Sequence, residues 1–258
     1  MRYWNYEEFT EKVRRLITID LSAYNERQMK RRIDAFLVRN KQENYNSFYK
    51  AMTKDVELKE KFINFLTINV TEFFRNPPQW QKMKLEIIPK IMELSQPLKI
   101  WSSACSTGEE PYSMVMLLNQ FMDMKDIKIL ATDIDEDAIQ KAKKGAYDEK
   151  TLKNLSKGQI SKYFHRDSER YVVNDELKRC VQFKTLNLLE DQYPKNCHLI
   201  LCRNVMIYFT QEAKEEMYKR FYDSLLPGGV LFLGNTEQII NPCKYGLISM
   251  KSFFYTKR

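Results

Sequence analysis

Small and acidic residues gather where a strand pattern passes into a helix pattern. Residues 102–108, Ser-Ser-Ala-Cys-Ser-Thr-Gly, join a strand at 98–101 to a helix that has Pro111 in its first turn. Small residues let the backbone pass close to a ligand, and Gly108 gives the freedom needed for a tight turn. Glu110 stands at the start of the helix. A carboxylate there suits a cationic sulfonium or ammonium group and not a pyrophosphate.

A second acidic residue, Asp133, ends the next strand pattern, which begins at Ile127. At that position a carboxylate can accept hydrogen bonds from both ribose hydroxyls of an adenosyl group. The preceding loop has one glycine where a dinucleotide site needs three, and no P-loop motif is present. On pattern alone, an ordinary strand–turn–helix with an exposed Asp133 explains the segment equally well.

Polar residues also follow a later buried strand pattern at 199–202. Arg203, Asn204 and Tyr208 come directly after it, and the carboxyl edge of a parallel sheet is where a reacting centre is expected. The simpler reading is a core strand that runs into a loop, with Tyr208 serving as packing. That reading leaves the adjacent Arg–Asn pair unexplained.

A third polar group precedes the strands. Asn69, Thr71 and Arg75 would reach a ligand if their segment folded over the edge of the sheet. By pattern alone the segment is the end of a helix, with Phe73 and Phe74 in the core.

Two different patterns divide the chain. Residues 1–75 have apolar residues at helical spacing, and no glycine occurs before position 108, so a small helical bundle is expected. Pro77-Pro78 ends this part, and a helix kinked or divided at Pro89 forms a connector. From residue 98 onward strands and helices alternate, which is typical of a mainly parallel sheet with helices on both faces.

The expected strands and turns continue to the C-terminus. A helix at about 136–144 stops at Gly145, and Phe253–Tyr255 is expected to be an edge or near-edge strand. Tyr171–Val173 and Val181–Phe183, separated by a short polar run, suggest a small antiparallel insertion.

Composition limits the class of protein. The 258 residues carry a net charge of +8, contain two histidines and form no CxxC pair, so no metal site is expected. No apolar run reaches the ~20 residues of a membrane-spanning helix and no signal peptide is recognisable, so a cytoplasmic location is expected. The basic excess is strongest at Arg27, Lys30, Arg31 and Arg32. Nucleic acid, an anionic membrane and a glutamate-rich protein all fit as partners.

Taken together, the segments resemble the CheR family of chemotaxis receptor glutamate methyltransferases. The likeness covers nearly the whole chain, and the matching runs follow the family's order. They are Thr67–Arg75, Ile100–Tyr112, Ala131–Asp135, Asn187–Leu189 and Cys202–Phe209.

The resemblance implies an α/β fold with a mainly parallel, Rossmann-like class I methyltransferase sheet. It places a helical receptor-contacting domain at 1–75, a linker helix at 76–97 and the methyltransferase domain at 98–258, with an antiparallel subdomain at about 161–185. Its cofactor is S-adenosylmethionine, which leaves as S-adenosylhomocysteine.

The resemblance also assigns residues to roles. Arg75 and Tyr208 would act nearest the transferred methyl. The receptor-contacting helix would carry Arg27, Lys30, Arg31 and Arg32. The residues that would bind the cofactor are Asn69, Thr71, Arg75, Glu110, Asp133, Asn187, Leu188, Arg203 and Asn204.

The implied reaction converts glutamate side chains of chemotaxis receptor helices to methyl esters. The chain would meet the membrane only through the receptor and would bind no nucleic acid. Some family members also bind a receptor tail peptide through a glycine-containing loop of the antiparallel subdomain. Residues 165–181 contain no glycine, so no such tether is expected here.

Two alternatives stay open at this level. A nucleic-acid methyltransferase shares the cofactor and the positive charge, and Asn76-Pro77-Pro78-Gln79 imitates the motif of amino-directed enzymes. That run precedes the first strand of the sheet, however, and ends in a residue that is not aromatic. The other alternative is an adaptor that binds the cofactor without turnover.

Overall fold

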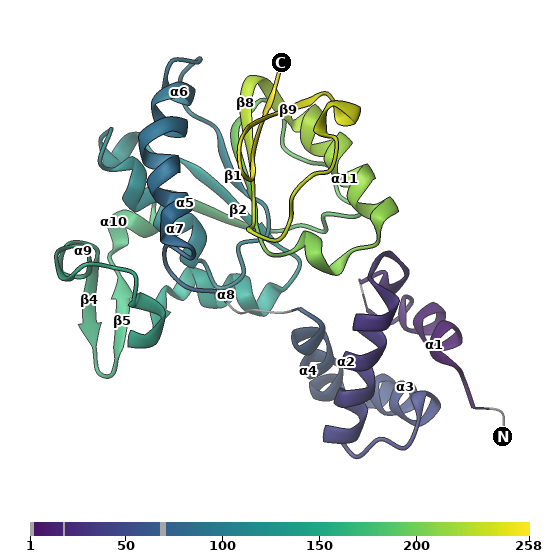
Figure 1. Ribbon diagram of the computed structural model, residues 1–258. Helices are drawn as coiled ribbons and strands as arrows, with labels where there is room; N and C mark the ends of the chain where they lie inside the picture. Colours follow the sequence, from purple (N-terminus) through teal and green to yellow (C-terminus); the bar gives the residue numbers. More distant parts are fainter. Residues whose placement is uncertain (1–2, 18, 68–70) are drawn as a thin grey trace. The chain divides into compact units, whose positions relative to one another are not determined.

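The computed structural model describes residues 3–17, 19–67 and 71–258 and divides into two compact units (Figure 1). One contains the chain up to residue 68 together with 206–216, and the other contains 69–205 and 217–258. The sequence pattern had placed the end of the helical domain at residue 75. The division comes earlier because Phe73 packs on Tyr147 and Phe164, and Phe74 packs on Trp80, all within the second unit.

The first unit is helical, as the pattern predicts. Most of its helices begin with an Asn or Asp whose side chain accepts a backbone N–H, a cap that contributes about 1 kcal/mol each. Phe9, Phe36, Phe48 and Phe62 form the centre of its core. Its elements are α1 (Tyr6–Val13), η1 (Leu21–Ala23), α2 (Glu26–Arg39), α3 (Tyr45–Lys54) and α4 (Val56–Leu66).

A segment from far along the sequence completes this unit. It comprises η5 (Met206–Tyr208) and the first part of α11 (Gln211–Ser224). The N–H of Asn25 donates to the carbonyl oxygen of Tyr208, and the N–H of Thr210 donates to that of Ala23, both at 2.8 Å. The rings of Tyr24 and Phe209 lie 4.9 Å apart. No local sequence pattern predicts this pairing, because its partners are more than 180 residues apart.

The second unit contains a seven-stranded sheet in the order β6-β2-β1-β7-β8-β10-β9. The first five strands run parallel, and β10 pairs antiparallel with both β8 and β9, so the expected mainly parallel sheet is confirmed. Phe254 and Tyr255 lie in the near-edge strand. The strands are β1 (Ile100–Ser102), β2 (Ile129–Asp133), β6 (Val181–Thr185), β7 (Cys197–Cys202), β8 (Leu225–Leu233), β9 (Leu247–Lys251) and β10 (Phe254–Lys257).

A separate three-stranded antiparallel sheet contains β3 (Ala146–Tyr147), β4 (Phe164–Asp167) and β5 (Arg170–Val173), in the order β3-β5-β4. The expected pairing of Tyr171–Val173 with Val181–Phe183 is wrong. The short helix α10 (Asp175–Lys178) separates these runs and returns the chain to the large sheet, where β6 pairs in parallel with β2. The strands of the small sheet therefore lie within 146–173 and do not extend to 185.

Helices cover both faces of the large sheet (Figure 1). On one side lies the connector, in which α5 (Pro77–Lys82), a π-helical turn at η2 (Met83–Ile87) and α6 (Ile88–Met92) form one helical stretch around Pro89. On the other side Phe221 of α11 contacts Trp101. The remaining elements are η3 (Met124–Asp126), α8 (Glu136–Lys144), η4 (Glu149–Leu152), α9 (Lys157–Tyr163) and η6 (Pro242–Tyr245).

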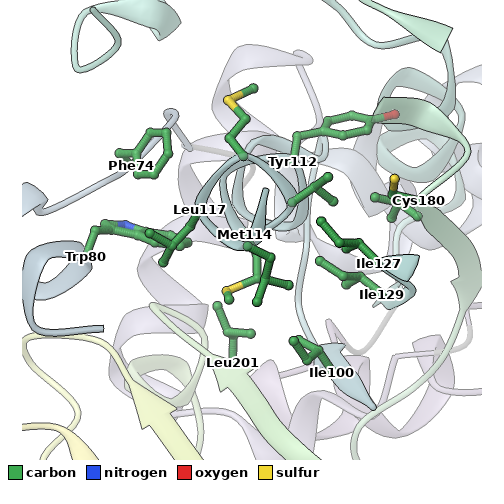
Figure 2. Packing of buried hydrophobic residues seen from close by; sticks show 14 of the residues in the cluster. Phe74, Trp80, Ile100, Tyr112, Met114, Leu117, Ile127, Ile129, Cys180 and Leu201 are labelled. Carbon is green, nitrogen blue, oxygen red and sulfur yellow. The ribbon is translucent and has the colours of Figure 1, made fainter. Parts of the chain in front are cut away.

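Helix α7 (Glu109–Leu118) follows β1 and is buried along its whole length. Figure 2 shows Leu117 pointing toward Trp80 and Met114 pointing toward Leu201, from different sides of the same helix. After its acidic first turn the helix is apolar on all sides except at Ser113, as is typical of a helix inside a domain. This burial fixes the helix start, and with it Glu110, against the sheet.

The turn before α7 requires glycine at position 108. Its φ is +96°, and a Cβ there would lie 2.9 Å from both the Ala142 Cβ and the Tyr147 hydroxyl. We expect Gly108→Ala to lower the free energy of unfolding by about 1–3 kcal/mol in denaturant titrations.

Gly158→Ala is the matched control. Gly158 lies in α9 with an ordinary φ, and the nearest atom to a Cβ there is the Ser156 Oγ at 4.0 Å. This variant should be neutral or slightly stabilising. Equal effects of the two substitutions would contradict the steric argument.

Candidate functional site

The order of the strands identifies where the large sheet would bind a ligand, at the carboxyl ends of its parallel strands. From β1 the chain proceeds to β2 and β6 on one side, and it later returns to β7 and β8 on the other. The carboxyl end of β1 is therefore a topological switch point, the position where open α/β sheets bind ligands. Glu110 lies at the start of α7, Asp133 at the end of β2 and Arg203 directly after β7.

Glu110 and Arg203 form a buried ion pair at this edge. The Nη1 of Arg203 lies 3.5 Å from the Oε2 of Glu110, and the Ser102 hydroxyl donates to the Oε1 at 2.8 Å. Burial raises the pKa of Glu110, while the nearby Arg203 acts in the opposite direction. Burial likewise lowers the pKa of Arg203 against the opposing field of Glu110. A buried charge of this kind persists when it is paired and hydrogen-bonded.

Arg203 also binds the segment before α5. Its Nη2 donates to the carbonyl oxygen of Arg75 at 2.8 Å, to the Oδ1 of Asn76 at 3.2 Å and to the Oε1 of Gln79 at 3.1 Å. The indole N–H of Trp80 donates to the same Arg75 carbonyl at 3.0 Å. The backbone at Arg75 is thus fixed from two directions.

Asp133 ends β2 with both carboxylate oxygens oriented by backbone donors. The N–H of Ser106 donates to Oδ2 at 2.7 Å, and the N–H of Asp135 donates to Oδ1 at 3.0 Å. Burial raises the pKa of Asp133 to about 6, although these N–H donors lower it. Burial also raises the pKa of Cys105, and the fields of Asp133 and Glu110 act in the same direction.

Asn187 and Leu188 follow β6 next to this strand end. The N–H of Leu186 donates to the carbonyl oxygen of Asp133 at 2.9 Å. The carbonyl of Leu188 accepts from the Tyr193 hydroxyl at 2.7 Å and from Arg220 at 2.6 Å. Asn187 is half-buried and Leu188 is buried. The segment is therefore held at the same edge as Asp133.

Left-handed backbone conformations occur in several of these loops. Non-glycine residues with positive φ include Phe74 (49°), Asn76 (61°), Ser106 (47°) and Asn204 (60°). Such conformations cost free energy and persist where surrounding contacts enforce them, often at ligand sites. Here Ser113 accepts from the N–H of Phe74, Asp133 from that of Ser106 and Glu237 from that of Asn204. The side chain of Asn76 accepts from Arg203.

The other residues singled out from the sequence lie in different places. Thr71 and Arg75 are half-buried in the sheet-containing unit, whereas Asn69 falls outside the described residues. Tyr208 belongs to the helical unit, so the continuous run 202–209 is divided between the two units. On α2, Arg27, Lys30 and Arg31 are exposed. Arg32 is half-buried and its guanidinium binds the carbonyl of Phe65.

Several residues of the site were not found from the sequence. Ser102 and Gln79 bind members of the buried ion pair, and Glu237, 4% exposed, binds the N–H of Asn204. Asn76 and Gln79, which had been treated as part of a misleading motif, are ligands of Arg203. The partners of Asn76, Gln79 and Glu237 are distant along the chain, so no local pattern marks these side chains.

The chemistry of these groups fits an adenosyl sulfonium ligand. Two buried carboxylates stand beside a loop of small residues, suited to a ribose diol and to a cationic amino-acid end. Within the described part of the chain, the Nε of Arg203 and the Nε2 of Gln79 are buried donors without a hydrogen bond. A ligand carboxylate would satisfy such donors.

The comparisons with known proteins agree with this chemistry. Residues 5–67 match the model of the CheR methyltransferase all-alpha domain, and 69–254 match that of the CheR methyltransferase SAM-binding domain. The chain belongs to the CheR methyltransferase family. It is an S-adenosylmethionine-dependent methyltransferase of chemotaxis.

Relatives within the CheR family cover most of the chain. A chemotaxis protein methyltransferase of Listeria innocua is 41% identical over 98% of this chain and 97% of its own length. That of Listeria monocytogenes is 40% identical over the same shares. That of Escherichia coli strain K12 is 39% identical over 69% of this chain and 64% of its own length. Among the described residues, no helix is long and apolar enough to cross a membrane.

Proposed function

We propose that this CheR-family enzyme methylates glutamate side chains on the cytoplasmic helices of chemotaxis receptors and so adapts chemotactic signalling. The observation that carries the proposal is the near full-length likeness to proteins named chemotaxis protein methyltransferase. The exposed basic residues of α2 and the buried carboxylates at the sheet edge support the same choice of substrate and cofactor.

The cofactor would be held by the residues that meet at the edge of the sheet. Glu110 suits the amino group of its methionyl end, Asp133 suits the ribose, and Asn187 and Leu188 suit the adenine. The loop with Arg203 and Asn204 would close the site, and we include Asn69, Thr71 and Arg75 from the family resemblance. When bound, the cofactor supplies a methyl group on a cationic sulfur. The carboxylate oxygen would bond to the methyl carbon, and the sulfur would leave with the electron pair of the broken bond.

The substrate needs alignment more than activation. A glutamate side chain has a pKa of about 4.3, so at neutral pH its carboxylate is already ionised and no general base is required. A hydrated carboxylate is nevertheless a poor nucleophile, and the enzyme must orient it and exclude water. A positively charged Arg75 would orient the carboxylate, and Arg203 and Trp80 hold the backbone of Arg75 in place.

Arg75 is proposed to pair with the incoming carboxylate, and Tyr208 to donate a hydrogen bond to it. The assignment of Tyr208 rests on the family motif. We further propose that the enzyme docks on the receptor body without binding a tail peptide, since no glycine occurs in 165–181.

A labelling assay tests the substrate. Tritiated S-adenosylmethionine incubated with the enzyme and receptor-bearing membranes should label the receptor, and mild base should release the label as methanol, because a glutamyl methyl ester is base-labile. Base-stable label in nucleic acid would instead support a nucleic-acid methyltransferase. Cofactor binding without any transfer would support a non-catalytic adaptor.

Arg75→Ala tests the positioning of the substrate. We expect turnover in the receptor assay to fall about 100-fold, since misplacement of a reacting group by about 1 Å can cost this much. The dissociation constant of S-adenosylhomocysteine, measured by calorimetry, should change less than turnover does. The control is Lys82→Ala at an exposed position of α5, which should retain activity. Unchanged turnover in Arg75→Ala would exclude the role.

Charge reversal on α2 tests the receptor-contacting surface. Replacing Arg27, Lys30 and Arg31 by Glu should slow receptor methylation about tenfold at low salt and leave cofactor affinity unchanged, because opposite charges speed encounter. Added salt should weaken methylation by the unmodified enzyme. The matched control reverses exposed Lys12, Lys50 and Lys54, for the same change in net charge. Equal losses in both triple variants would argue against α2 as the contact.

The raised pKa of Asp133 predicts a pH dependence. The ribose hydroxyls need an ionised acceptor, so affinity for S-adenosylhomocysteine should fall as pH decreases through about 6, by about tenfold at pH 5. Calorimetry from pH 7.5 to 5 measures this fall.

Asp133→Asn should bind more weakly and lose most of this pH dependence. Glu109, whose pKa burial raises to about 7, titrates in a similar range, so Glu109→Gln serves as the control and should keep the fall. If Asp133→Asn retained the slope of the unmodified enzyme, another group would be responsible.

A further inference from the structure

The loop after β7 depends on a carboxylate from a different strand connection. Asn204 has a left-handed backbone, with φ of 60°, directly after the buried Arg203. Its N–H donates to the Oε2 of Glu237 at 2.6 Å. Glu237 follows β8 and is 4% exposed. A short charge-assisted hydrogen bond of this kind is among the stronger ones available to a backbone amide.

Glu237 is itself held in place. The N–H of Gly234 donates to the same Oε2 at 2.7 Å, and the N–H of Glu237 donates back to the carbonyl of Gly234 at 3.0 Å. A Cβ on Gly234 would lie 2.3 Å from this Oε2 and 2.9 Å from the N of Asn204. The close approach of the end of β8, the carboxylate and Asn204 therefore requires glycine at 234.

Three charged side chains act on the guanidinium of Arg203. The guanidinium experiences the fields of Glu110 and Glu237, which favour its charge, and that of Arg75, which opposes it. Glu237 thus accepts a hydrogen bond from the backbone of Asn204, and its negative charge also favours the positive charge of Arg203. Two separable effects, the position of an acceptor oxygen and a negative charge, come from one side chain.

We propose that Glu237 is a positioning residue of the cofactor site, whose acceptor oxygen fixes the left-handed turn at Asn204 and thereby the placement of Arg203 and Asn204 toward the cofactor. This inference rests on the proposed cofactor role of that loop. Loss of the oxygen would let the turn relax toward more common backbone angles and weaken cofactor binding. Loss of the charge alone would have a smaller effect.

Two substitutions separate oxygen position from charge. Glu237→Gln keeps an oxygen at the same distance from the backbone and removes the charge, whereas Glu237→Asp keeps the charge and withdraws the oxygen by one methylene. The dissociation constant of S-adenosylhomocysteine should stay within about threefold for the Gln variant and rise about tenfold for the Asp variant. The KM for S-adenosylmethionine should follow, with kcat on receptor-bearing membranes changed less.

The control is Gln238→Ala, exposed and one residue further along the same loop, which should bind normally. All measurements are made well below the unfolding midpoint of each variant, so a purely structural role would lower stability without changing affinity. A normal dissociation constant for the Asp variant, or equal losses for Asp and Gln, would overturn the proposal.

Arg203→Lys and Asn204→Ala separate this inference from its premise. If both bind S-adenosylhomocysteine normally, the cofactor role of the loop and the inference fail together. If they bind weakly while Glu237→Asp binds normally, only the inference fails.

Discussion

A single buried guanidinium joins segments that are far apart in the sequence. Arg203 pairs with Glu110 at the start of α7 and donates to Arg75, Asn76 and Gln79 before and within α5. Removing it would leave a buried carboxylate unpaired, which typically costs about 3–5 kcal/mol. The same contacts hold the turn that carries Arg75. Arg203 therefore contributes both to the stability of the sheet edge and, together with Trp80, to the placement of the proposed substrate-binding arginine.

Burying ionisable groups at this edge of the sheet costs free energy, and such a cost is typical of a functional site. Burial raises the pKa of Glu110, Asp133 and Cys105 and lowers that of Arg203. Perturbed groups concentrated in one place suggest a site adapted to a ligand and not to maximal stability. The left-handed turns at Ser106 and Asn204 support the same conclusion, because each brings a backbone N–H to a carboxylate.

A motif that is continuous in sequence is divided in the structure. Arg203 and Asn204 belong to the sheet-containing unit. Tyr208 belongs to the helical unit, where its carbonyl accepts from the N–H of Asn25 and the ring of the adjacent Phe209 packs on Tyr24. The helical unit is therefore built partly from the second half of the chain.

The sequence by itself determined the class of fold and the local position of the main site residues. The apolar runs give β1, β2 and β7, and Gly145 ends α8 as expected, because these features depend on neighbours within a few residues. The order of the strands then brings Glu110, Asp133 and Arg203 to one edge. The same reasoning failed for Val181–Phe183, since pairing is chosen among all available strands and not by proximity in sequence.

Only the tertiary structure decided which side chains support the site. Gln79, Asn76 and Glu237 have no local pattern that marks them, and their partners lie 33 to 127 residues away. The assignment of Met206–Glu216 to the helical unit is equally invisible in the sequence. Burial, charge pairing and left-handed turns depend on the whole surroundings of a residue, and those surroundings exist only once the chain has folded.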